Sequence, residues 1–438
     1  MLKIKESPAV FKSYSISQLR RIPQLEKFSH HELLSMEVVG NVLPFKVNTY
    51  VTDELIDWDK APDDPIFRLT FPQEEMLHPL QFSLMEKALR HNQDREHIKD
   101  VADSIRELLN PHPAGQMEFN IPEVEGNSLN GLQHKYRETV LFFPSQGQTC
   151  HSYCTFCFRW PQFVGMEGMK FAAKETEQLV EYLRRHEEVS DVLFTGGDPL
   201  IMRTGALRTY IEPLLNAGLP NLKTIRIGTK ALSYWPYRFT SGKDADDLIA
   251  LFEEIGKKGI HLALMAHFSH PVELSTSVVE SAIRRIRETG VQIRTQSPVL
   301  RHINDSPEVW AEMWTKQVAM GCIPYYMFMP RDTGAKKYFE VPLVEAWEIF
   351  RKAYQQVSGI CRTVRGPSMS CTPGKIQMLG VSEIPTETGM KKVMTLRFLQ
   401  GRDPDWVVRP FFAEYDPNAT WIDELRPAFG GNKFFFEK

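Results

Sequence analysis

The chain has 438 residues, which is enough for about three domain-sized units or for one large enzyme core with extensions. Its 52 basic and 55 acidic residues give a formal net charge of −3, and this argues against a general nucleic-acid-binding surface, which needs a basic excess. No apolar run reaches the ~20 residues of a membrane-spanning helix, and the first residues lack the apolar stretch of a secretory signal. We therefore expect a cytoplasmic protein that binds neither nucleic acid nor membrane.

The N-terminal part, residues 1–133, is predicted to form a mostly helical extension. Residues 15–37 and 81–109 carry apolar side chains at helical spacing. Residues 63–68 and 111–115 are rich in Asp, Pro and Gly and are predicted to be loops.

The hydrophobic pattern of the sequence changes at Glu138, where short apolar, β-branched runs begin to alternate with helical stretches. The predicted strands are Thr139–Phe143, Asp191–Phe194, Thr224–Ile227, His261–Ala266, Val291–Thr295 and Tyr325–Phe328. The predicted helices are Lys174–Arg185, Gly205–Leu215, Asp244–Lys257, Ser277–Thr289, Pro307–Met320 and Val344–Val357.

Six strand–helix units in succession predict an α/β fold with a parallel sheet, here assigned to a core of residues 134–360. The pattern fits both a doubly wound sheet and an incomplete barrel. Residues 361–438 are rich in Pro, Gly and aromatic residues, and we expect them to form a C-terminal segment that covers the core.

Three of the six cysteines lie within eight residues, directly after the first predicted strand. Loops at the ends of parallel strands are where α/β enzymes build their sites. The C-x3-C-x2-C spacing of Cys150, Cys154 and Cys157 suits a [4Fe–4S] cluster that leaves one iron open to a non-protein ligand. A zinc site, which would need a fourth ligand, and three unrelated buried cysteines are the alternatives. The other cysteines are predicted to be small buried residues: Cys322, Cys361 and Cys371.

A second motif, Gly196-Gly197-Asp198-Pro199, follows the second predicted strand. Glycines permit close approach of a ligand to the backbone, and the exposed N–H groups of such a loop can bind a carboxylate. Taken alone, this sequence is also typical of an ordinary turn.

The cysteine spacing and its place after the first strand resemble the radical S-adenosylmethionine (SAM) enzymes. The resemblance implies that the open iron is chelated by the amino and carboxylate groups of SAM. Electron transfer from the cluster then cleaves SAM to methionine and a 5′-deoxyadenosyl radical. It also implies a partial (β/α)6 barrel, and it assigns Gly196, Gly197 and Asp198 to binding the amino group of SAM.

Within that superfamily the chain resembles the lysine 2,3-aminomutase family. The resemblance is carried by an ordered set of segments: His134–Tyr136, the cysteine loop with Arg159, Phe194–Leu200, Arg226–Ala231, His267–Pro271, Gln296–Arg301, Asn304-Asp305, Pro324–Tyr326 and Pro373–Ile376.

This closer resemblance implies pyridoxal 5′-phosphate (PLP) as a further cofactor and assigns roles to four residues. Lys375 matches the lysine that holds PLP as a Schiff base, and Arg159 matches the arginine that binds the substrate α-carboxylate. His267 and Gln296 match positions on the SAM side of the site. Each also has an ordinary structural interpretation, such as a solvated lysine or a hydrogen-bonded core histidine.

The chain departs from the lysine enzymes where those enzymes bind the substrate ammonium group. Arg331 stands in the place of one aspartate, and Ser370-Cys371-Thr372 provides no carboxylate for the other. Arg331 predicts a substrate with a distal carboxylate or a neutral polar group, unless it points to solvent or pairs with Asp332. Thr139 replaces a phosphate-binding arginine, which leaves Lys135 and Arg137 as phosphate ligands. Ser306 replaces a zinc-binding cysteine of several family members, and we expect no zinc.

The sequence therefore predicts an isomerase, a radical SAM and PLP-dependent amino-acid 2,3-aminomutase that is not optimised for lysine. The alternatives are an enzyme of the same lineage with a changed substrate and no PLP, and a non-catalytic iron–sulfur or zinc protein. The expected partners are an amino-acid substrate and an electron donor such as a flavodoxin or ferredoxin, with assembly into a homo-oligomer left open.

Overall fold

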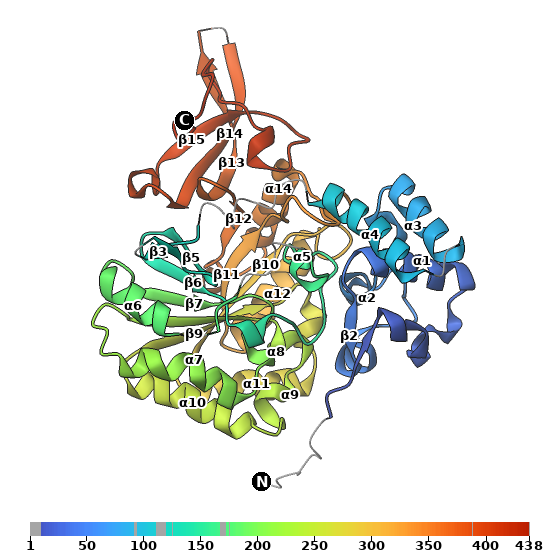
Figure 1. The fold of residues 1–438 in the computed structure, drawn as a ribbon. Coiled ribbons are helices and arrows are strands. Elements are labelled where there is room, and N and C mark those ends of the chain that lie inside the picture. Colours follow the sequence, from blue (N-terminus) through green and yellow to red (C-terminus); the bar gives the residue numbers. More distant parts are fainter. Residues whose placement is uncertain are drawn as a thin grey trace.

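The structure is a computed structural model that describes residues 10–91, 94–110, 120–124, 126–166, 172–174, 176–387 and 389–437 (Figure 1). The loop predicted at residues 111–115 lies outside these ranges. The helices are α1 (His30–Val42), α2 (Pro65–Thr70), α3 (Pro79–His91), α4 (Arg95–Leu109), α5 (Trp160–Phe163), α6 (Glu177–Arg185), α7 (Thr204–Asn216), α8 (Ala231–Tyr234), α9 (Tyr237–Thr240), α10 (Ala245–Lys257), α11 (Ser277–Glu288), α12 (Pro307–Ala319), α13 (Lys336–Phe339) and α14 (Leu343–Gln355).

The strands form one large sheet and two small ribbons. They are β1 (Ser13–Ser15), β2 (Lys46–Asn48), β3 (Glu123–Val124), β4 (Asn127–Ser128), β5 (Leu132–Tyr136), β6 (Thr139–Phe142), β7 (Asp191–Phe194), β8 (Thr224–Thr229), β9 (His261–His267), β10 (Gln292–Pro298), β11 (Ile323–Phe328), β12 (Arg365–Ser370), β13 (Gly374–Thr386), β14 (Gly389–Gly401) and β15 (Pro410–Glu414).

The large sheet has the strand order β15-β14-β13-β12-β11-β10-β9-β8-β7-β6-β5 among the described residues. Strands β6 to β12 run parallel to one another, while β5 and the strands from β13 onward are antiparallel to their neighbours. The six predicted strands are β6 to β11 in the predicted order, so the α/β prediction with a largely parallel sheet is confirmed.

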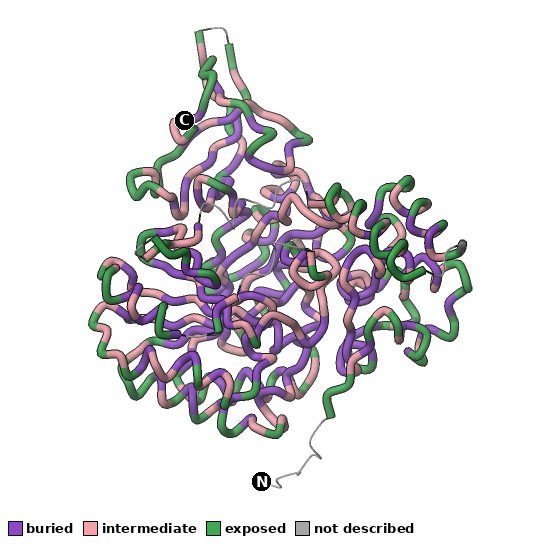
Figure 2. Tube along the Cα trace, viewed as in Figure 1, coloured by how far each residue is buried: buried purple, intermediate pink, exposed green. Residues whose placement is uncertain are grey.

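The core follows from the hydrophobic patterns of these elements. Strand β9 is buried at five consecutive positions, as expected for a parallel strand covered on both faces. Helix α11 begins at the cap Thr276 and buries Val279, Ala282, Ile283 and Ile286, one stripe at helical spacing. Figure 2 shows the result, with buried strands inside and exposed residues along the outer faces of the helices.

The C-terminal segment differs from the expected cover, because its strands continue the sheet itself. Strand β12 adds a parallel strand beside β11, and β13, β14 and β15 follow as an antiparallel meander (Figure 1). The sequence of β12, Arg-Gly-Pro-Ser-Met-Ser, lacks the β-branched and aromatic residues that mark strands, and so it gave no strand signal.

The N-terminal extension is mostly helical as predicted, but the loop predicted at residues 63–68 is wrong, because Asp64 caps the short helix α2 there. The beginning of the extension is not one long helix. Residues 16–21 and 23–27 form two short 3₁₀ helices, separated from α1 by Phe28 and Ser29. The extension contacts the core through the β1–β2 ribbon, and Figure 1 shows it as a separate lobe beside the sheet. None of the described helices is both long and apolar enough to cross a membrane.

Candidate active site

The predicted site residues gather at one edge of the sheet, because the carboxyl ends of parallel strands lie together. The cysteine loop follows β6, and Gly196 to Asp198 follow β7. His267 ends β9, and Gln296 lies beside it on β10, paired with His267 on one side and with Tyr326 of β11 on the other. Arg331 follows β11.

The three loop cysteines are free thiols that lie close enough to influence one another's ionisation. Burial raises the pKa of Cys150 and Cys154, and it raises the pKa of Cys157 to about 12, with the neighbouring Cys154 contributing. These partly buried thiols are therefore held neutral until a cation offsets the charge of the thiolate. This donor set fits the thiolate ligands of an iron–sulfur cluster.

Among the described residues no three His, Cys, Asp or Glu side chains are close enough together to hold a single metal ion. A four-iron cubane holds its thiolates further apart than one ion does, because the cluster itself lies between them.

The N-terminal extension fixes the shape of this loop. Lys46 Nζ donates a hydrogen bond of 2.7 Å to the carbonyl of Cys150, and the N–H of Tyr153 donates to the carbonyl of Lys46 at 2.8 Å. Asn48, fully buried, donates from its backbone to Ser152 Oγ at 3.0 Å and from its side chain to the carbonyl of Tyr234 at 2.8 Å. These residues were not recognised from the sequence, since 104 positions separate Asn48 from Ser152.

The glycine motif packs directly against the start of the cysteine loop. A Cβ atom added at Gly197 would lie 2.5 Å from the backbone nitrogen and oxygen of Thr149. Gly196 has φ +135°, a conformation that L side chains rarely adopt. The two motifs therefore form one surface, and the glycines are required by that contact.

Asp198 ties the ends of β7 and β8 together. Its buried carboxylate accepts hydrogen bonds from Thr229 Oγ1 at 2.8 Å, from the backbone of Lys230 at 2.8 Å and from the backbone of Leu200 at 2.9 Å. The geometry gives Asp198 a positioning function for the loop that was predicted to bind SAM.

The Nε2 atom of His267 is buried and has no hydrogen-bond partner within the described structure. Burial lowers its pKa well below the usual range, so the imidazole is neutral. Its ring lies 5.6 Å from the ring of Phe156 in the cysteine loop. An unpartnered buried nitrogen beside the cysteine loop fits a position that receives a polar ligand.

Two partly buried lysines lie near the turn that precedes β13. Lys375 Nζ lies 4.2 Å from the ring centroid of Tyr326, and burial lowers its pKa to about 8. Lys135 Nζ donates to the carbonyl of Cys371, and burial lowers its pKa to about 7. A neutral amine is nucleophilic, so Lys375 fits the position of a PLP-binding lysine.

Two arginines face one aromatic ring. The guanidinium carbon of Arg159 lies 5.0 Å from the ring centroid of Phe158, and that of Arg331 lies 5.4 Å from it. Arg159 Nη1 is buried without a hydrogen-bond partner in the described residues, while Arg331 Nη1 donates to the carbonyl of Ser370 at 2.6 Å. Phe158 was not singled out in the sequence.

These four cations, of which Arg159 is buried and the others are partly buried, lack acidic partners among the described residues. Among the described residues, no carboxylate forms an ion pair with Lys135, Arg159, Arg331 or Lys375. Burial lowers the pKa of Arg159 to about 10, and the nearby charge of Arg331 also lowers it. Burial likewise lowers the pKa of Arg331, and the charge of Asp332 offsets only part of this effect. The site is thus arranged to receive anions.

One of the two expected phosphate ligands, Arg137, is not buried at the site, and Thr139 has a structural partner. Arg137 is exposed. The hydroxyl of Thr139 donates a hydrogen bond of 2.9 Å to Asp191, and Asp191 also forms an ion pair with Arg226. Lys135 therefore remains as the predicted phosphate ligand that lies at the site.

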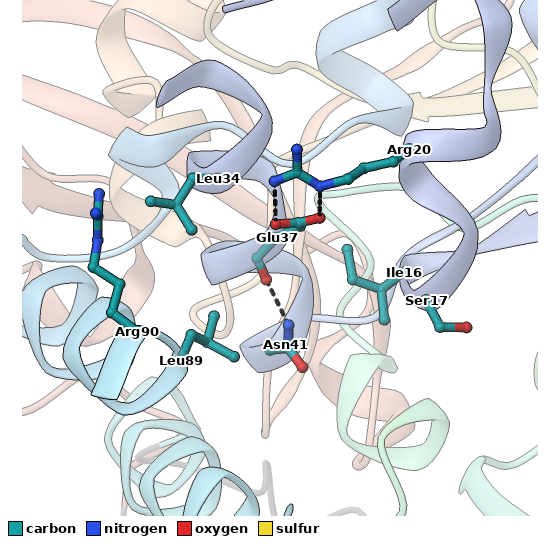
Figure 3. A pocket seen from close by; sticks show the side chains of 8 residues that line it. All are labelled: Ile16, Ser17, Arg20, Leu34, Glu37, Asn41, Leu89 and Arg90. Carbon is teal, nitrogen blue, oxygen red and sulfur yellow. Dashed lines mark hydrogen bonds and ion pairs between the residues drawn. The ribbon is translucent and has the colours of Figure 1, made fainter. Parts of the chain in front are cut away.

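A surface pocket of about 380 Å³ lies in the N-terminal extension and holds none of the predicted site residues (Figure 3). Its walls include the Arg20–Glu37 ion pair at 2.6 Å. The lining residues are Ile16, Ser17, Arg20, Leu34, Glu37, Asn41, Leu89 and Arg90.

The chain is similar to proteins described as lysine 2,3-aminomutases. It is 30% identical over 404 residues to the "Putative L-lysine 2,3-aminomutase" of Aquifex aeolicus (strain VF5), covering 91% of this chain and 92% of that protein. It is 30% identical over 243 residues to the L-lysine 2,3-aminomutase of Bacillus subtilis (strain 168), and 28% identical over 248 residues to that of Clostridium subterminale. These two alignments cover 56% and 57% of this chain and 48% and 56% of the relatives, about half of their length.

Solved structures give a more distant likeness. A radical SAM methyltransferase from Sphaerobacter thermophilus has a TM-score of 0.39 at 17% identity, covering 55% of this chain and 68% of that one. Streptococcus suis SuiB has a TM-score of 0.36 at 14% identity, covering 66% of this chain and 59% of that one. No protein-family model matches the chain.

The parallel sheet, the cysteine loop at its carboxyl edge and the Aquifex alignment over nearly the whole chain together define the class. The chain belongs to the radical SAM superfamily and, within it, to the lysine 2,3-aminomutase-like family. The resemblance inferred from the ordered motifs is thereby confirmed.

Proposed function

We propose that the protein is a radical SAM, PLP-dependent 2,3-aminomutase with a partial (β/α)6 barrel core, acting on an amino acid that carries a second carboxylate. When bound, the reduced cluster and SAM supply a 5′-deoxyadenosyl radical, and PLP supplies the carbonyl group that carries the migrating amino group. The observation that carries the proposal is the pair of guanidiniums facing Phe158 without an acidic partner.

Each functional group has a place in this proposal. Cys150, Cys154 and Cys157 hold the cluster, and Lys375 holds PLP. Gly196, Gly197 and His267 lie beside the cysteine loop, where SAM is expected, with Gln296 next to His267. The residues position these groups and exclude water, while the cofactors supply the radical chemistry.

The proposed substrate class follows from the positive charges of the two arginines. Arg159 is expected to bind the α-carboxylate in a bidentate manner, because a guanidinium presents two parallel donors to a carboxylate. Arg331, on the same ring, would then face the end of the substrate side chain. A lysine ammonium there would meet a like charge, whereas the distal carboxylate of glutamate or aspartate would meet an opposite one.

The proposal is tested by competition among lysine, glutamate, glutamine and alanine, with reduced enzyme, SAM and PLP and with products identified by mass spectrometry. We expect a β-amino dicarboxylate product from the wild type. In Arg331→Ala we expect kcat/KM for that substrate to fall at least about tenfold, which corresponds to about 1.4 kcal/mol. Arg331→Asp should shift turnover toward lysine.

The matched control is Arg351→Ala, which removes a surface arginine that pairs with Glu348 on α14 at 2.9 Å. It should leave the substrate preference unchanged. Efficient turnover of lysine by the wild type, unaffected by Arg331→Ala, would contradict the substrate assignment. Preference for glutamine over glutamate would assign a neutral polar substrate instead.

One observation favours an alternative, an enzyme of the same lineage without PLP. Thr139 occupies the place of a phosphate-binding arginine, and its hydroxyl is engaged by Asp191. The PLP content of the purified protein separates the two candidates: stoichiometric PLP supports the aminomutase, and its absence after reconstitution supports the alternative.

We also propose a cytoplasmic location and a one-electron donor of the flavodoxin or ferredoxin class, because reduction of the cluster requires a low-potential electron from outside the chain. Assembly into a homo-oligomer remains a prediction.

A further inference from the structure

A buried network connects Cys154 to an ion pair at the ends of three parallel strands. Cys154 Sγ lies 3.6 Å from the hydroxyl of Tyr234, which is 1% exposed. Lys230 Nζ lies 4.4 Å from the centroid of the Tyr234 ring and forms an ion pair of 2.7 Å with Glu273. Tyr234 and Lys230 follow β8, and Glu273 follows β9.

The network is held rigidly from several sides. The Glu273 carboxylate accepts hydrogen bonds from the backbone N–H groups of Ser269 and His270, the latter at 3.1 Å. The backbone N–H of Lys230 donates to Asp198 at 2.8 Å. Glu273 is fully buried, so its charge is fixed by Lys230 and by these donors rather than by solvent.

The hydrogen bond between Cys154 and Tyr234 has one direction once the thiol binds iron. A ligating cysteine is a thiolate and carries no proton, so the sulfur can only accept. The tyrosine hydroxyl must then donate. Lys230 on the face of the ring favours this, because a cation withdraws electron density from the phenol and makes its O–H a better donor.

We propose that Tyr234, held by the Lys230–Glu273 ion pair, is a positioning residue that donates a hydrogen bond to the Cys154 sulfur of the cluster and raises its reduction potential. Reduction adds one electron, and therefore one negative charge, to the cluster and its sulfurs. A donor aimed at a ligand sulfur stabilises the reduced form more than the oxidised form. The electron comes from the external one-electron donor, and no proton is transferred. This inference rests on the proposed cluster.

The test is a redox titration of the anaerobically reconstituted protein, followed by electron paramagnetic resonance of the reduced cluster. Tyr234→Phe keeps the ring and removes the hydroxyl. We expect full iron content and a more negative midpoint potential, with about tenfold less reduced cluster at a fixed potential, which is about 59 mV for one electron. The matched control is Tyr210→Phe, which removes a buried hydroxyl that bonds Ser145 at 3.1 Å, and it should leave the potential unchanged.

A second measurement covers the case in which Tyr234→Phe does not fold. Proton electron–nuclear double resonance on the wild type in H2O and D2O should show an exchangeable proton strongly coupled to the cluster through the Cys154 sulfur. An unchanged potential in an iron-replete Tyr234→Phe, or no such proton in the wild type, would overturn the inference. A wild type that binds no cluster would instead overturn the proposed function, and this inference with it.

Discussion

At the scale of single residues, the site is defined by buried or partly buried cations that have no acidic partner among the described residues. Burial moves the pKa of Lys375 from its ordinary value near 10.5 to about 8, and that of Lys135 to about 7. Lys135 already donates to a carbonyl, whereas Lys375 makes no hydrogen bond or ion pair within the described residues and lies against the ring of Tyr326. Lys375 is therefore the amine that is available to react with an aldehyde.

Lys375→Ala should abolish covalent PLP binding while leaving iron content unchanged, because the reacting amine is lost and the cysteine loop is untouched. The measurement is mass spectrometry of a borohydride-reduced tryptic digest. In the wild type, PLP attachment should rise as the pH passes about 8, since the unprotonated amine is the nucleophile and its pKa is lowered to that value. Lys135→Ala is the comparison, and PLP fixed to Lys135 rather than to Lys375 would contradict the assignment.

Site residues were predictable from the sequence where they belong to local motifs. They were not predictable where only the fold brings distant residues together. Cys150, Arg159 and Lys375 each stand in a recognisable segment. Phe158 carried no signal, since a lone aromatic beside a cysteine motif is most often a packing residue. Its contact with both Arg159 and Arg331 brings together residues that are more than 170 positions apart in the sequence.

At the scale of elements, the cysteine loop and the glycine motif depend on each other. The N–H of Asp198 donates to the carbonyl of Thr149 at 2.7 Å, and Gly197 has no room for a side chain against the same residue. A displacement of the glycine loop would therefore move the residue that precedes Cys150.

Gly197→Ala should lower the iron content after reconstitution and lower Tm, because the new methyl group would clash with the backbone of Thr149. Iron analysis and thermal unfolding measure the two effects. Gly205→Ala is the matched control: it lies in α7 with no atom within 4 Å of the added Cβ, and it should change Tm by no more than a few degrees upward. Equal iron content and equal Tm in the two variants would show that cluster binding does not need the close contact between Gly197 and Thr149.

Helices and strands with a clear hydrophobic periodicity were predictable from the sequence. Elements that form only because neighbouring strands pair with them were not. Strands β6 to β11 and the helices between them follow the predicted order. Strand β12 exists because β11 and β13 pair with its backbone, which is a property of the assembled sheet rather than of its residues. The residues before α1 form 3₁₀ turns around Pro23 where helical spacing suggested a helix.

At the scale of the whole molecule, both ends of the chain support the site at the carboxyl edge of the sheet. The N-terminal extension holds the cysteine loop through Lys46 and Asn48. The C-terminal meander presents Lys375 at the start of β13, and Arg402 donates to the carbonyl of Thr372 in the preceding turn at 2.8 Å. The parallel core alone thus lacks the contacts that hold the cysteine loop and the strand that carries Lys375. We therefore expect a truncation of either end to weaken cofactor binding.

We propose that the three loop cysteines together hold a cluster that cleaves SAM. The most direct measurement is iron content together with 5′-deoxyadenosine formed from SAM after anaerobic reduction, compared among single alanine variants. Each of Cys150→Ala, Cys154→Ala and Cys157→Ala should lose the complete cluster and form no 5′-deoxyadenosine, since each removes one thiolate ligand. Variants of the buried cysteines outside the loop, Cys322→Ala and Cys361→Ala, should retain both. Full iron content and SAM cleavage in any one of the three loop variants would contradict the account.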